Sequence, residues 1–468
     1  MTPEDPLEIE EGYELRLISA DDKGIYVSLY KEGKEKDGQK VDIADGSGST
    51  YLYKYEYVDN KKFVTIAIHF RNHFSSGDGG AWCDGIFQIA DNFEDLEQRI
   101  GEMTSRTANK NQIIMKNDEN IELTENKDIN FMGKFWIKTA DKDDSDANPL
   151  KFCVYRREDE PGTYEIRSPL ALVQNGDEFW NAEKFAGFYF DLDNNIKTEE
   201  ITVSITEDHK LREKTGIIYT TYPELSTFSF KDWGGFSVIG FLGEKYFAAY
   251  DDNSYLRSES DQWDLMKYEM LSKVLIDSNN EAVLTEGKTL RLAEGYGLTI
   301  TSIDIHGNRA WIELSKNGQK VEGSDSVVSP SDQNAEMKDK TYIYKKDIGR
   351  CNGIPLIAVH FKNSMDGLVT IDGVWQISET SKDISEGEKY ENMKIKSVEN
   401  GKITMFNTED ISLRKRNLPL MEHILIKTSN SDSDNGNKYF YICREDTVEI
   451  IWKPDENEVI YISRRGWT

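Results

Sequence analysis

Two histidines occupy the same place in two nearly identical stretches, and histidine suits metal binding or general-base chemistry near neutral pH. The stretches are IAIHFRN at residues 66–72 and IAVHFKN at residues 357–363, which makes His69 and His360 equivalent. A metal site needs further ligands of compatible type held close by. We recognise no second histidine, cysteine or carboxylate pattern repeated beside them. The sequence therefore predicts structural strand histidines, with no metal site and no catalytic site at either position.

Three acidic loops place oxygen ligands close together along the chain. The candidates are Asp141, Asp143, Asp144 and Asp146 in the first loop, Asp191, Asp193 and Asn195 in the second, and Asp432, Asp434 and Asn435 in the third. Calcium takes about six to eight oxygens, and none of these loops has the glycine and distal glutamate of an EF-hand. We expect solvated turn residues. Calcium binding is kept as the less favoured alternative, and no other cofactor is predicted.

Aromatic side chains such as Trp233, Tyr246 and Trp375 raise a second class of function, because exposed aromatic rings stack on sugars. These residues lie on alternating strand patterns, where packing in a core explains them equally well. An extracellular carbohydrate-binding or adhesion module is therefore the alternative rather than the main expectation.

An enzyme is the third class of function. The sequence contains no GxSxG, no phosphate-binding P-loop, no HExxH and no GxGxxG before a helix. Carboxylates are abundant, but nothing singles out two of them as a glycosidase pair. We predict no enzymatic activity and no catalytic residue.

The charge balance restricts the partners. The chain of 468 residues has 57 Lys and Arg against 85 Asp and Glu, a formal net charge of −28. A surface with this excess of negative charge repels phosphate backbones and anionic lipid head groups. Nucleic acids and membrane surfaces are therefore poor partners. No apolar run approaches the roughly 20 residues of a membrane helix, and the acidic N-terminus does not resemble a signal peptide. These features predict either a cytosolic chain or a piece of a larger protein.

The elements that must position these residues form an internal repeat, because residues 7–169 match residues 290–454 in one order. LEIEEGYEL matches LRLAEGYGL, YLYKYEY matches YIYKKDI, CDGIFQIAD matches IDGVWQISE, and WIKTADKDDSD matches LIKTSNSDSD. A third block, residues 170–289, has no second copy in the chain. The cysteines Cys83, Cys153, Cys351 and Cys443 do not recur between the copies, so we expect isolated apolar residues rather than disulfides or zinc ligands.

The local pattern is β throughout. Short runs rich in Val, Ile, Tyr, Phe and Thr are separated by turn residues, as in β-sandwiches. The pattern predicts a hairpin around residues 306–308 and a turn at Asn317 and Gly318. In the stretch KFVTIAIHF, alternation places Ile66 and Ile68 on a core face. One helical stripe, Trp263, Met266, Met270 and Val274, predicts a short helix within residues 258–275.

Several phrases resemble the S-layer family duplication domain of methanogenic archaea. They are FAGFYFDLD, GEKYFAAY, LSKVLID, LRLAEGYGLTITSIDI, WIELSKNGQKV, IAVHF and DGVWQIS. The resemblance is densest over residues 170–454 and extends more divergently over residues 7–169. It implies an all-β, mainly antiparallel fold of three tandem β-sandwich lobes. Residues 1–165 would be the second lobe of an incomplete domain, residues 166–289 the first lobe of a complete domain, and residues 290–468 its second lobe.

The resemblance also implies a function. Proteins of this family are secreted and tile into a two-dimensional sheet that coats the cell, so the expected partners are further copies of the protein and the cell envelope. The expected location is the cell surface. An intact coat protein would carry a signal peptide and a membrane anchor, and this chain has neither, which predicts a fragment. No Asn-x-Ser/Thr sequon is present, so glycosylation of this segment is not predicted.

Overall fold

In the computed structural model the chain is mostly β, with antiparallel pairing in nearly every sheet. The structure describes residues 1–43, 49–56, 61–77, 79–92, 99–141, 149–158, 161–304, 308–414, 417–429, 438–448 and 458–460. The chain divides into two compact units, Met1–Asp118 and Glu119–Thr468. Each unit is described by itself.

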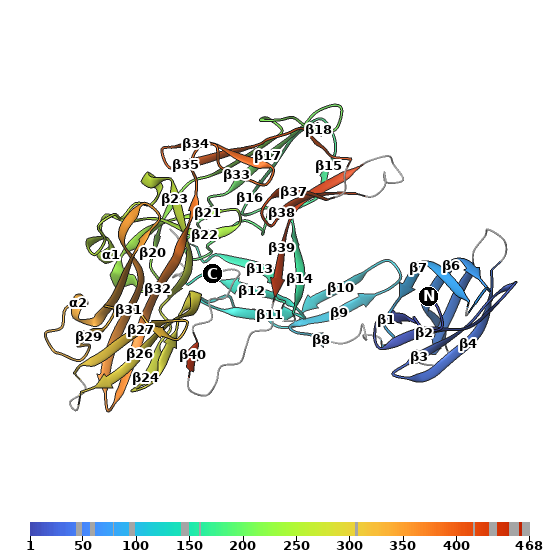
Figure 1. Ribbon diagram of the computed structural model, residues 1–468, viewed down its shortest axis with the longest axis horizontal. Coiled ribbons are helices and arrows are strands. Elements are labelled where there is room, and N and C mark those ends of the chain that lie inside the picture. The colour runs from blue at the N-terminus through green and yellow to red at the C-terminus, as the bar shows by residue number, and fades with distance from the viewer. Residues whose placement is uncertain are drawn as a thin grey trace. The chain divides into compact units, whose positions relative to one another are not determined.

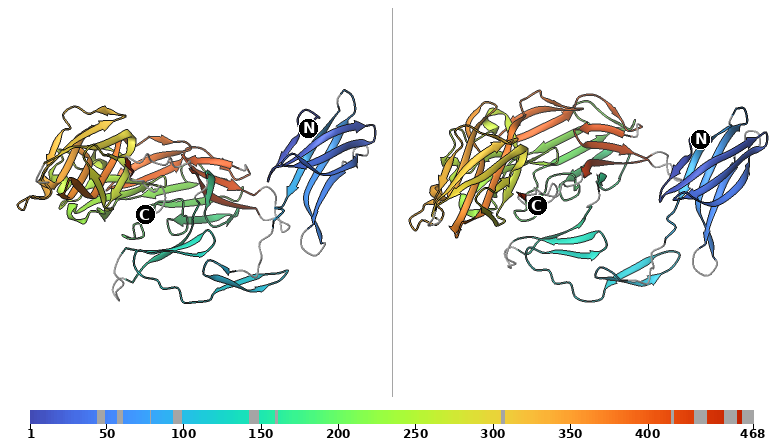
Figure 2. Two further views of the ribbon diagram at one scale, coloured as in Figure 1. Left: turned by 90° about the horizontal axis from the view of Figure 1, so that it is seen from below. Right: turned by 60° about the horizontal axis from the view of Figure 1, so that its bottom comes forward.

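The first unit contains a β-sandwich (Figure 1, and from two further sides in Figure 2). One sheet has the strand order β1-β2-β3-β4 and the facing sheet has the order β5-β6-β7. Their bounds are β1 Leu7–Ile9, β2 Tyr13–Asp21, β3 Gly24–Lys31, β4 Lys34–Asp42, β5 Ser49–Glu56, β6 Lys62–Phe74 and β7 Gly80–Gln88. Alternate residues of the strands face inward. Ile66 and Ile68 of β6 are fully buried as predicted, and so is Phe70. Both sheets contribute to one hydrophobic core.

A third sheet of three strands completes the first unit. Its order is β10-β9-β8. The strands are β8 Arg99–Ile100, β9 Met103–Ala108 and β10 Ile113–Asn117.

The second unit begins with a separate three-stranded sheet and then builds larger sheets from distant segments. The first sheet has the order β11-β12-β13, with β11 Asp128–Met132, β12 Phe135–Thr139 and β13 Phe152–Arg156. A five-stranded sheet has the order β14-β39-β38-β37, with β15 also on β39. Its strands are β14 Gly162–Arg167, β15 Ala171–Leu172, β37 Asn417–Met421, β38 Ile424–Thr428 and β39 Tyr439–Val448.

A six-stranded sheet has the order β16-β17-β19-β35-β34-β33. The strands are β16 Gly176–Asn181, β17 Glu200–Ile205, β19 Ile217–Thr221, β33 Lys389–Tyr390, β34 Met393–Glu399 and β35 Lys402–Asn407. A two-stranded ladder joins β18 Lys210–Leu211 to β36 Ile411–Ser412. Strands from both sides of the predicted boundary at 289 therefore share one sheet.

The largest sheet has eight strands in the order β20-β21-β22-β23-β32-β31-β30, with β24 also paired to β32. They are β20 Glu224–Thr227, β21 Gly235–Phe241, β22 Glu244–Tyr250, β23 Met270–Ser278, β24 Ala282–Thr285, β30 Thr341–Ile348, β31 Cys351–Met365 and β32 Leu368–Asp383. β21 supplies Phe236 and Val238 to one core and Ile239 and Phe241 to another. Burial on both faces explains why this strand is almost continuously apolar.

The sheet that faces the C-terminal part of this large sheet repeats the first sheet of the chain. Its order is β28-β27-β26-β25-β40, with β29 also on β27. The strands are β25 Thr289–Arg291, β26 Tyr296–Ile303, β27 Ala310–Lys316, β28 Gln319–Lys320, β29 Ser326–Val328 and β40 Glu458–Ile460. β26 and β27 pair as the two strands of the predicted hairpin, whose turn residues 306 and 307 lie outside the described residues. The turn at Asn317 and Gly318 is confirmed, with φ of 50° and 77°.

Helices are few and short in the described residues. They are α1 Tyr255–Ser258, α2 Met337–Lys340 and the 3-10 turns η2 Lys231–Trp233, η3 Met266–Tyr268 and η4 Ala293–Gly295. Of the predicted helix within residues 258–275 only the 3-10 turn Met266–Tyr268 forms, because Met270 and Val274 belong to β23, which pairs with β32. Pairing with a distant strand overrides a local helical stripe. No helix in the described part of the chain has the length and apolar composition that crossing a membrane requires.

The sheets run across both predicted domain boundaries. β14, which spans the boundary at 165, pairs with β39 near the C-terminus, and β19 pairs with β35 across the boundary at 289. The division into residues 1–165, 166–289 and 290–468 stays a prediction about the repeated sequence.

Candidate functional site

The two equivalent histidines each bond to a carboxylate. His69 Nδ1 lies 2.5 Å from Asp84 Oδ1, and His360 Nδ1 lies 2.5 Å from Asp372 Oδ1. The expectation that no carboxylate pattern repeats beside them was wrong. The signal was present in the sequence, because each aspartate precedes the glycine of CDGIF or IDGVW, and that glycine is the cross-strand partner of the histidine.

The surroundings of the two histidines differ between the copies. The His360 side chain is 9% exposed, and the ring of Phe230 stacks on it at 4.2 Å between centroids. The His69 side chain is 41% exposed. Among the described residues no group of three or more His, Cys, Asp or Glu is arranged to hold a metal ion. Each histidine and its aspartate therefore form a structural pair, in which the carboxylate orients the histidine ring.

A second cluster, which the sequence reasoning missed, joins the two sheets of the first copy. The Tyr13 hydroxyl of β2 donates to Asp91 Oδ2 at 2.8 Å, and Lys31 of β3 bonds to the same carboxylate. The Lys31 ammonium also lies over the Tyr13 ring, 4.7 Å from its centroid. The hydrogen bond from Lys31 lowers the pKa of Asp91 most strongly. Asp91 follows β7, so this cluster ties the end of the second sheet to the first.

The second copy has the same cluster at equivalent positions. The Tyr296 hydroxyl donates to Glu379 at 2.9 Å, Lys316 bonds to the same carboxylate, and Lys346 adds a further bond at 2.5 Å. The Lys316 ammonium lies 4.8 Å from the Tyr296 ring centroid. Hydrogen bonds from Lys316 and Lys346 lower the pKa of Glu379 to about 2. Aligning EGYEL with EGYGL and QIAD with QISE would have identified the tyrosine and carboxylate of this cluster.

A fully buried carboxylate, Glu199, lies just before β17 and accepts three hydrogen bonds. The Tyr219 hydroxyl donates to it at 2.7 Å, the Gly243 amide at 2.8 Å and the Tyr189 amide at 2.7 Å. Burial raises the pKa of Glu199 to about 7, although these donors oppose the shift.

Arg444 of β39 belongs to the same network, and its positive charge opposes the rise in the pKa of Glu199. It donates to Glu244 at 2.6 Å, to Asp446 at 2.9 Å and to the Gly187 carbonyl at 3.4 Å. These bonds connect the C-terminal strand of the second copy to the segment around β22. Removing one member of such a buried charged network leaves another charge without a partner, so the network acts as a structural cross-link.

The acidic loops are only partly within the described residues. Asp143, Asp144, Asp146, Asp432, Asp434 and Asn435 lie outside them. Asp191 is buried and accepts bonds from the Asn194 amide and side chain, each at 3.0 Å. Asn195 has a left-handed φ of 55°. The Asp141 amide donates to Asp193 Oδ1 at 2.6 Å, which brings two of the predicted loops together. Those contacts are typical of a hydrogen-bonded turn, and calcium binding stays a prediction.

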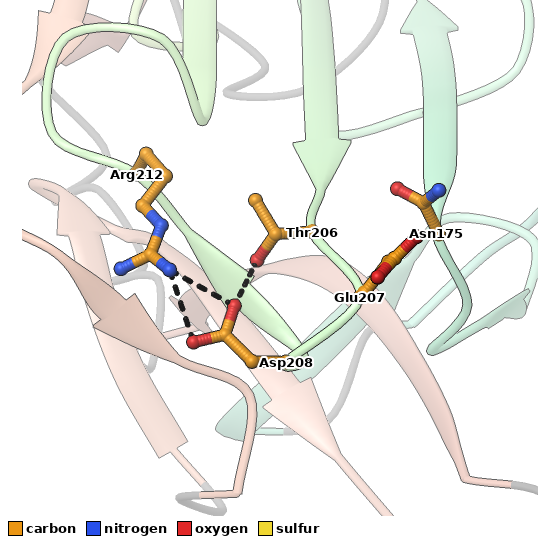
Figure 3. A pocket seen from close by; sticks show the side chains of 5 residues that line it. All are labelled: Asn175, Thr206, Glu207, Asp208 and Arg212. Carbon is orange, nitrogen blue, oxygen red and sulfur yellow. Dashed lines mark hydrogen bonds and ion pairs between the residues drawn. The ribbon is translucent and has the colours of Figure 1, made fainter.

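A shallow, open pocket is lined by Asn175, Thr206, Glu207, Asp208 and Arg212 (Figure 3). The Thr206 hydroxyl donates to Asp208 at 2.6 Å and Arg212 donates at 3.0 Å. The bond from Thr206, together with Lys210 and Arg212, lowers the pKa of Asp208 to about 2. Three of the five lining residues, Thr206, Asp208 and Arg212, bond to one another, as in an ordinary surface turn.

The candidate aromatic residues lie in the hydrophobic cores, and the four cysteines form no disulfide. Trp233, Tyr246 and Trp375 are buried in the cores, as the packing interpretation expected. All four cysteines are free thiols. Burial raises the pKa of Cys351 to about 11 and that of Cys443 to about 12, so both stay protonated at neutral pH.

Comparison with known proteins matches the chain to the family described as S-layer protein, over residues 1–141 and 171–430. The chain is also similar to three proteins described as "Major S-layer protein". It is 24% identical to that of Methanosarcina mazei over 463 residues, covering 95% of this chain and 65% of the relative. It is 25% identical to that of Methanosarcina acetivorans over 428 residues, covering 87% of this chain and 60% of the relative.

The third relative, from Methanosarcina barkeri, is 24% identical over 472 residues, which cover 97% of this chain and 64% of the relative. The chain thus spans somewhat less than two thirds of the length of these relatives. S-layer proteins are structural, non-enzymatic proteins of the cell surface. Because the family match covers most of the residues, the chain belongs to the S-layer protein family.

Proposed function

We propose that this chain is a structural module of an archaeal surface layer, which associates with further copies into a two-dimensional, porous lattice on the cell. The observation that carries the proposal is the duplication of one sandwich with one set of cross-links, in a chain that belongs to the S-layer family. Both copies keep the Tyr–Lys–carboxylate cluster and the His–Asp pair. Because both copies keep residues that cross-link their strands, these residues support a structural role for the chain.

We propose further that the chain is organised as tandem lobes over residues 1–165, 166–289 and 290–468. The two cross-linked copies support this division for the first and third segments. The middle segment supplies β16 to β24, which share sheets with strands of the third. That sharing supports placing residues 166–289 and 290–468 in the same domain of the layer.

The charge of the chain would determine what the pores admit. With a formal net charge of −28, the surface concentrates cations and slows anions close to it. The effect falls off over a Debye length of about 8 Å at physiological ionic strength. Pores lined by such surfaces would therefore discriminate by charge most strongly at low salt.

The carbohydrate-binding alternative has little support from the residues that raised it. Trp233 and Trp375 are buried in the core, so their rings are closed to a sugar.

Electron microscopy of the purified chain tests the proposed function. At increasing protein concentration, with salt and millimolar calcium, we expect ordered planar arrays in negative stain. The same preparation with a calcium chelator is the matched control, and it shows whether array formation requires calcium. Particles that stay monomeric at every concentration and in both buffers would count against lateral self-assembly.

A further inference from the structure

Each copy of the sandwich carries an exposed aromatic side chain at the same position of an outer sheet face. The residues are Tyr26 of β3 and Trp311 of β27, which are equivalent because GIYVSLYKEG aligns with RAWIELSKNG. Tyr26 is 40% exposed and Trp311 is 39% exposed. The next residues along the two strands, Val27 and Ile312, are buried in the cores. Alternation along a strand therefore turns the two aromatic rings to the solvent side of the sheet.

The backbone beside each ring is irregular at the same point. The pairing register of the hairpin shifts directly before Ser19 in the first copy and directly before Ser302 in the second. Ser19 is then the cross-strand neighbour of Tyr26, and Ser302 is the cross-strand neighbour of Trp311. Such bulges are often found where a strand has to aim a side chain at a functional surface. The small serine side chain also leaves one flank of each ring open.

The ring of Tyr26 lies along the sheet rather than standing away from it. A Cβ atom on Gly38 of β4 would lie 3.0 Å from the Tyr26 hydroxyl. The direct cross-strand partner of Tyr26 is Lys40, two residues farther along β4. The tyrosine therefore leans over the neighbouring strand and rests where a glycine leaves room, with one face of its ring turned outward.

The faces of these two rings are unoccupied. Among the described residues, no other ring and no cation stacks on Tyr26 or on Trp311. Tyr30, the second tyrosine on the outer face of β3, shows the contrast, because the guanidinium of Arg16 lies 4.3 Å from the centroid of its ring. The outer face of each copy thus presents an aromatic surface that no described side chain covers.

Hydrogen-bonding groups lie next to the ring in the first copy. Lys40, opposite Tyr26, bonds to Asp21 at 2.6 Å, and both side chains are exposed. Ser28, the next residue of β3 on the outer face, donates its hydroxyl to Glu35 at 2.9 Å. Donors and acceptors of these kinds fix the orientation of a polar ligand.

The second copy has comparable groups next to its ring. Lys320 bonds to Glu313 at 2.9 Å and to Asp325 at 2.8 Å. Glu313 is the next residue of β27 on the outer face after Trp311. The hydroxyl of Thr301 donates to the Trp311 carbonyl at 3.2 Å, which fixes the strand beneath the ring. Both copies therefore combine an open aromatic ring with an ammonium group and carboxylates.

This combination suits a sugar better than an apolar partner. The CH groups of a pyranose can pack on the aromatic ring, while its hydroxyls exchange hydrogen bonds with the charged groups around it. The formal net charge of −28 repels an anionic polymer and also a second copy of the chain. A neutral glycan meets no such repulsion.

We propose that the outer face around Tyr26 and the equivalent face around Trp311 each bind a neutral glycan. The aromatic ring stacks on a sugar ring, and the neighbouring lysine and carboxylates bond to sugar hydroxyls. These sites are distinct from Trp233 and Trp375, whose rings are buried. Glycan binding is an activity beyond the structural role, and it does not depend on lattice formation.

Affinity electrophoresis of the whole chain tests the proposal. Native gels contain hydroxyethylcellulose, laminarin, galactomannan or dextran, and a gel without polysaccharide is the reference. We expect at least one of these neutral polysaccharides to retard the chain. In that gel Tyr26→Ala and Trp311→Ala should each remove about half of the retardation, because one of two independent sites remains. The double variant should migrate as it does in the reference gel.

Two further variants serve as controls. Phe179→Ala removes a ring that is also 40% exposed, but Lys184 lies over that ring, 5.4 Å from its centroid, so retardation should not change. Tyr26→Trp keeps an aromatic ring, as the second copy has it, and should keep the binding. Circular dichroism verifies that all variants are folded, which we expect because these side chains lie outside the cores.

Two results would overturn the proposal. One is a chain that no polysaccharide retards, and the other is a double variant that is retarded as strongly as the unchanged chain. Sedimentation velocity without polysaccharide identifies the alternative occupant. If the chain is not retarded and the double variant loses self-association, this face binds a second copy rather than a glycan.

Discussion

Among single residues, the buried Glu199 has the most unusual chemistry. Its pKa of about 7 lies well above the ordinary value of 4.5. Between these values the folded chain binds more protons than the unfolded chain, so the contribution to stability is present below pH 4.5 and is lost as pH rises to 7. A shift of this size corresponds to roughly 3 kcal/mol. The buried carboxyl group, protonated in mild acid, thus makes this part of the chain more stable there than at neutral pH.

Glu199→Gln tests this contribution. The amide cannot accept all three hydrogen bonds, so we expect a loss of about 1–3 kcal/mol in the free energy of unfolding. The part of the pH dependence between pH 4.5 and 7 that is due to Glu199 should also disappear. Urea unfolding of both proteins at pH 5 and at pH 7.5 measures the change. An identical pH difference in the two proteins would contradict the assignment.

Glu379 should act in the opposite direction. Its pKa of about 2 lies below the ordinary value because of Lys316 and Lys346. The stability it contributes is present above pH 4.5 and is lost as pH falls to 2. Because the side chain is partly exposed, we expect about 1–2 kcal/mol rather than the full value of the shift. Acid unfolding followed by circular dichroism should show a shallower dependence below pH 4.5 in Glu379→Gln.

Asp91→Asn is the equivalent variant in the first copy, because Asp91 stands where Glu379 stands in the second. The pKa of Asp91 is lowered by Lys31 in the same kind of cluster. The Asp91→Asn variant should lose stability less steeply than the unchanged protein as pH falls below 4.5. This is the same direction of change as expected for Glu379→Gln in the second copy. Opposite signs would show that the two clusters are not equivalent.

At the scale of elements, the same strand has different neighbours in the two copies. Gly373 of β32 faces the ring of Phe230, whereas Gly85 of β7 faces open space beyond His69. Gly373→Ala should therefore cost about 1–3 kcal/mol of unfolding free energy, because the added methyl overpacks the site. Gly85→Ala should change stability by less than about 0.5 kcal/mol. Chemical unfolding of both variants provides the measurement, and equal effects would contradict the difference in packing.

At the scale of the whole molecule, the excess of carboxylates opposes close packing of copies. A formal net charge of −28 produces repulsion that salt screens, with a Debye length of about 30 Å at 0.01 M and about 3 Å at 1 M. We expect association to strengthen as sodium chloride rises across that range. Sedimentation velocity at constant protein concentration measures it. Association that weakens steadily with salt would indicate that ion pairs, rather than apolar faces and strand edges, hold the copies together.

Much of the local structure could be predicted from the sequence. The alternation in KFVTIAIHF correctly placed Ile66 and Ile68 in the core, and the dipeptide at Asn317 and Gly318 correctly marked a turn. The structural environment of Trp233 was also expected. These features depend on residues close in sequence, on the two-residue period of a strand and on residues that tolerate positive φ.

The contacts between distant segments were not predicted. Asp84 and Asp372 were overlooked as partners of the histidines, and the helix expected around Met270 is a strand. The network of Glu199 and Arg444 has no local pattern, because its members are brought together by sheets that join distant strands.

The sequence by itself determined the duplication, the β character, the turns and the inward face of each core strand, because these follow from short-range periodicity and from matching phrases. Only the tertiary structure decided which outward faces are closed. Phe87 and Trp375 stand at equivalent positions of equivalent strands, yet one is exposed and the other is buried. The difference arises because, among the described strands, those of residues 171–285 pair with strands of the second copy and not with those of the first. Burial of an outward face depends on which distant segment covers it, and no local pattern records that choice.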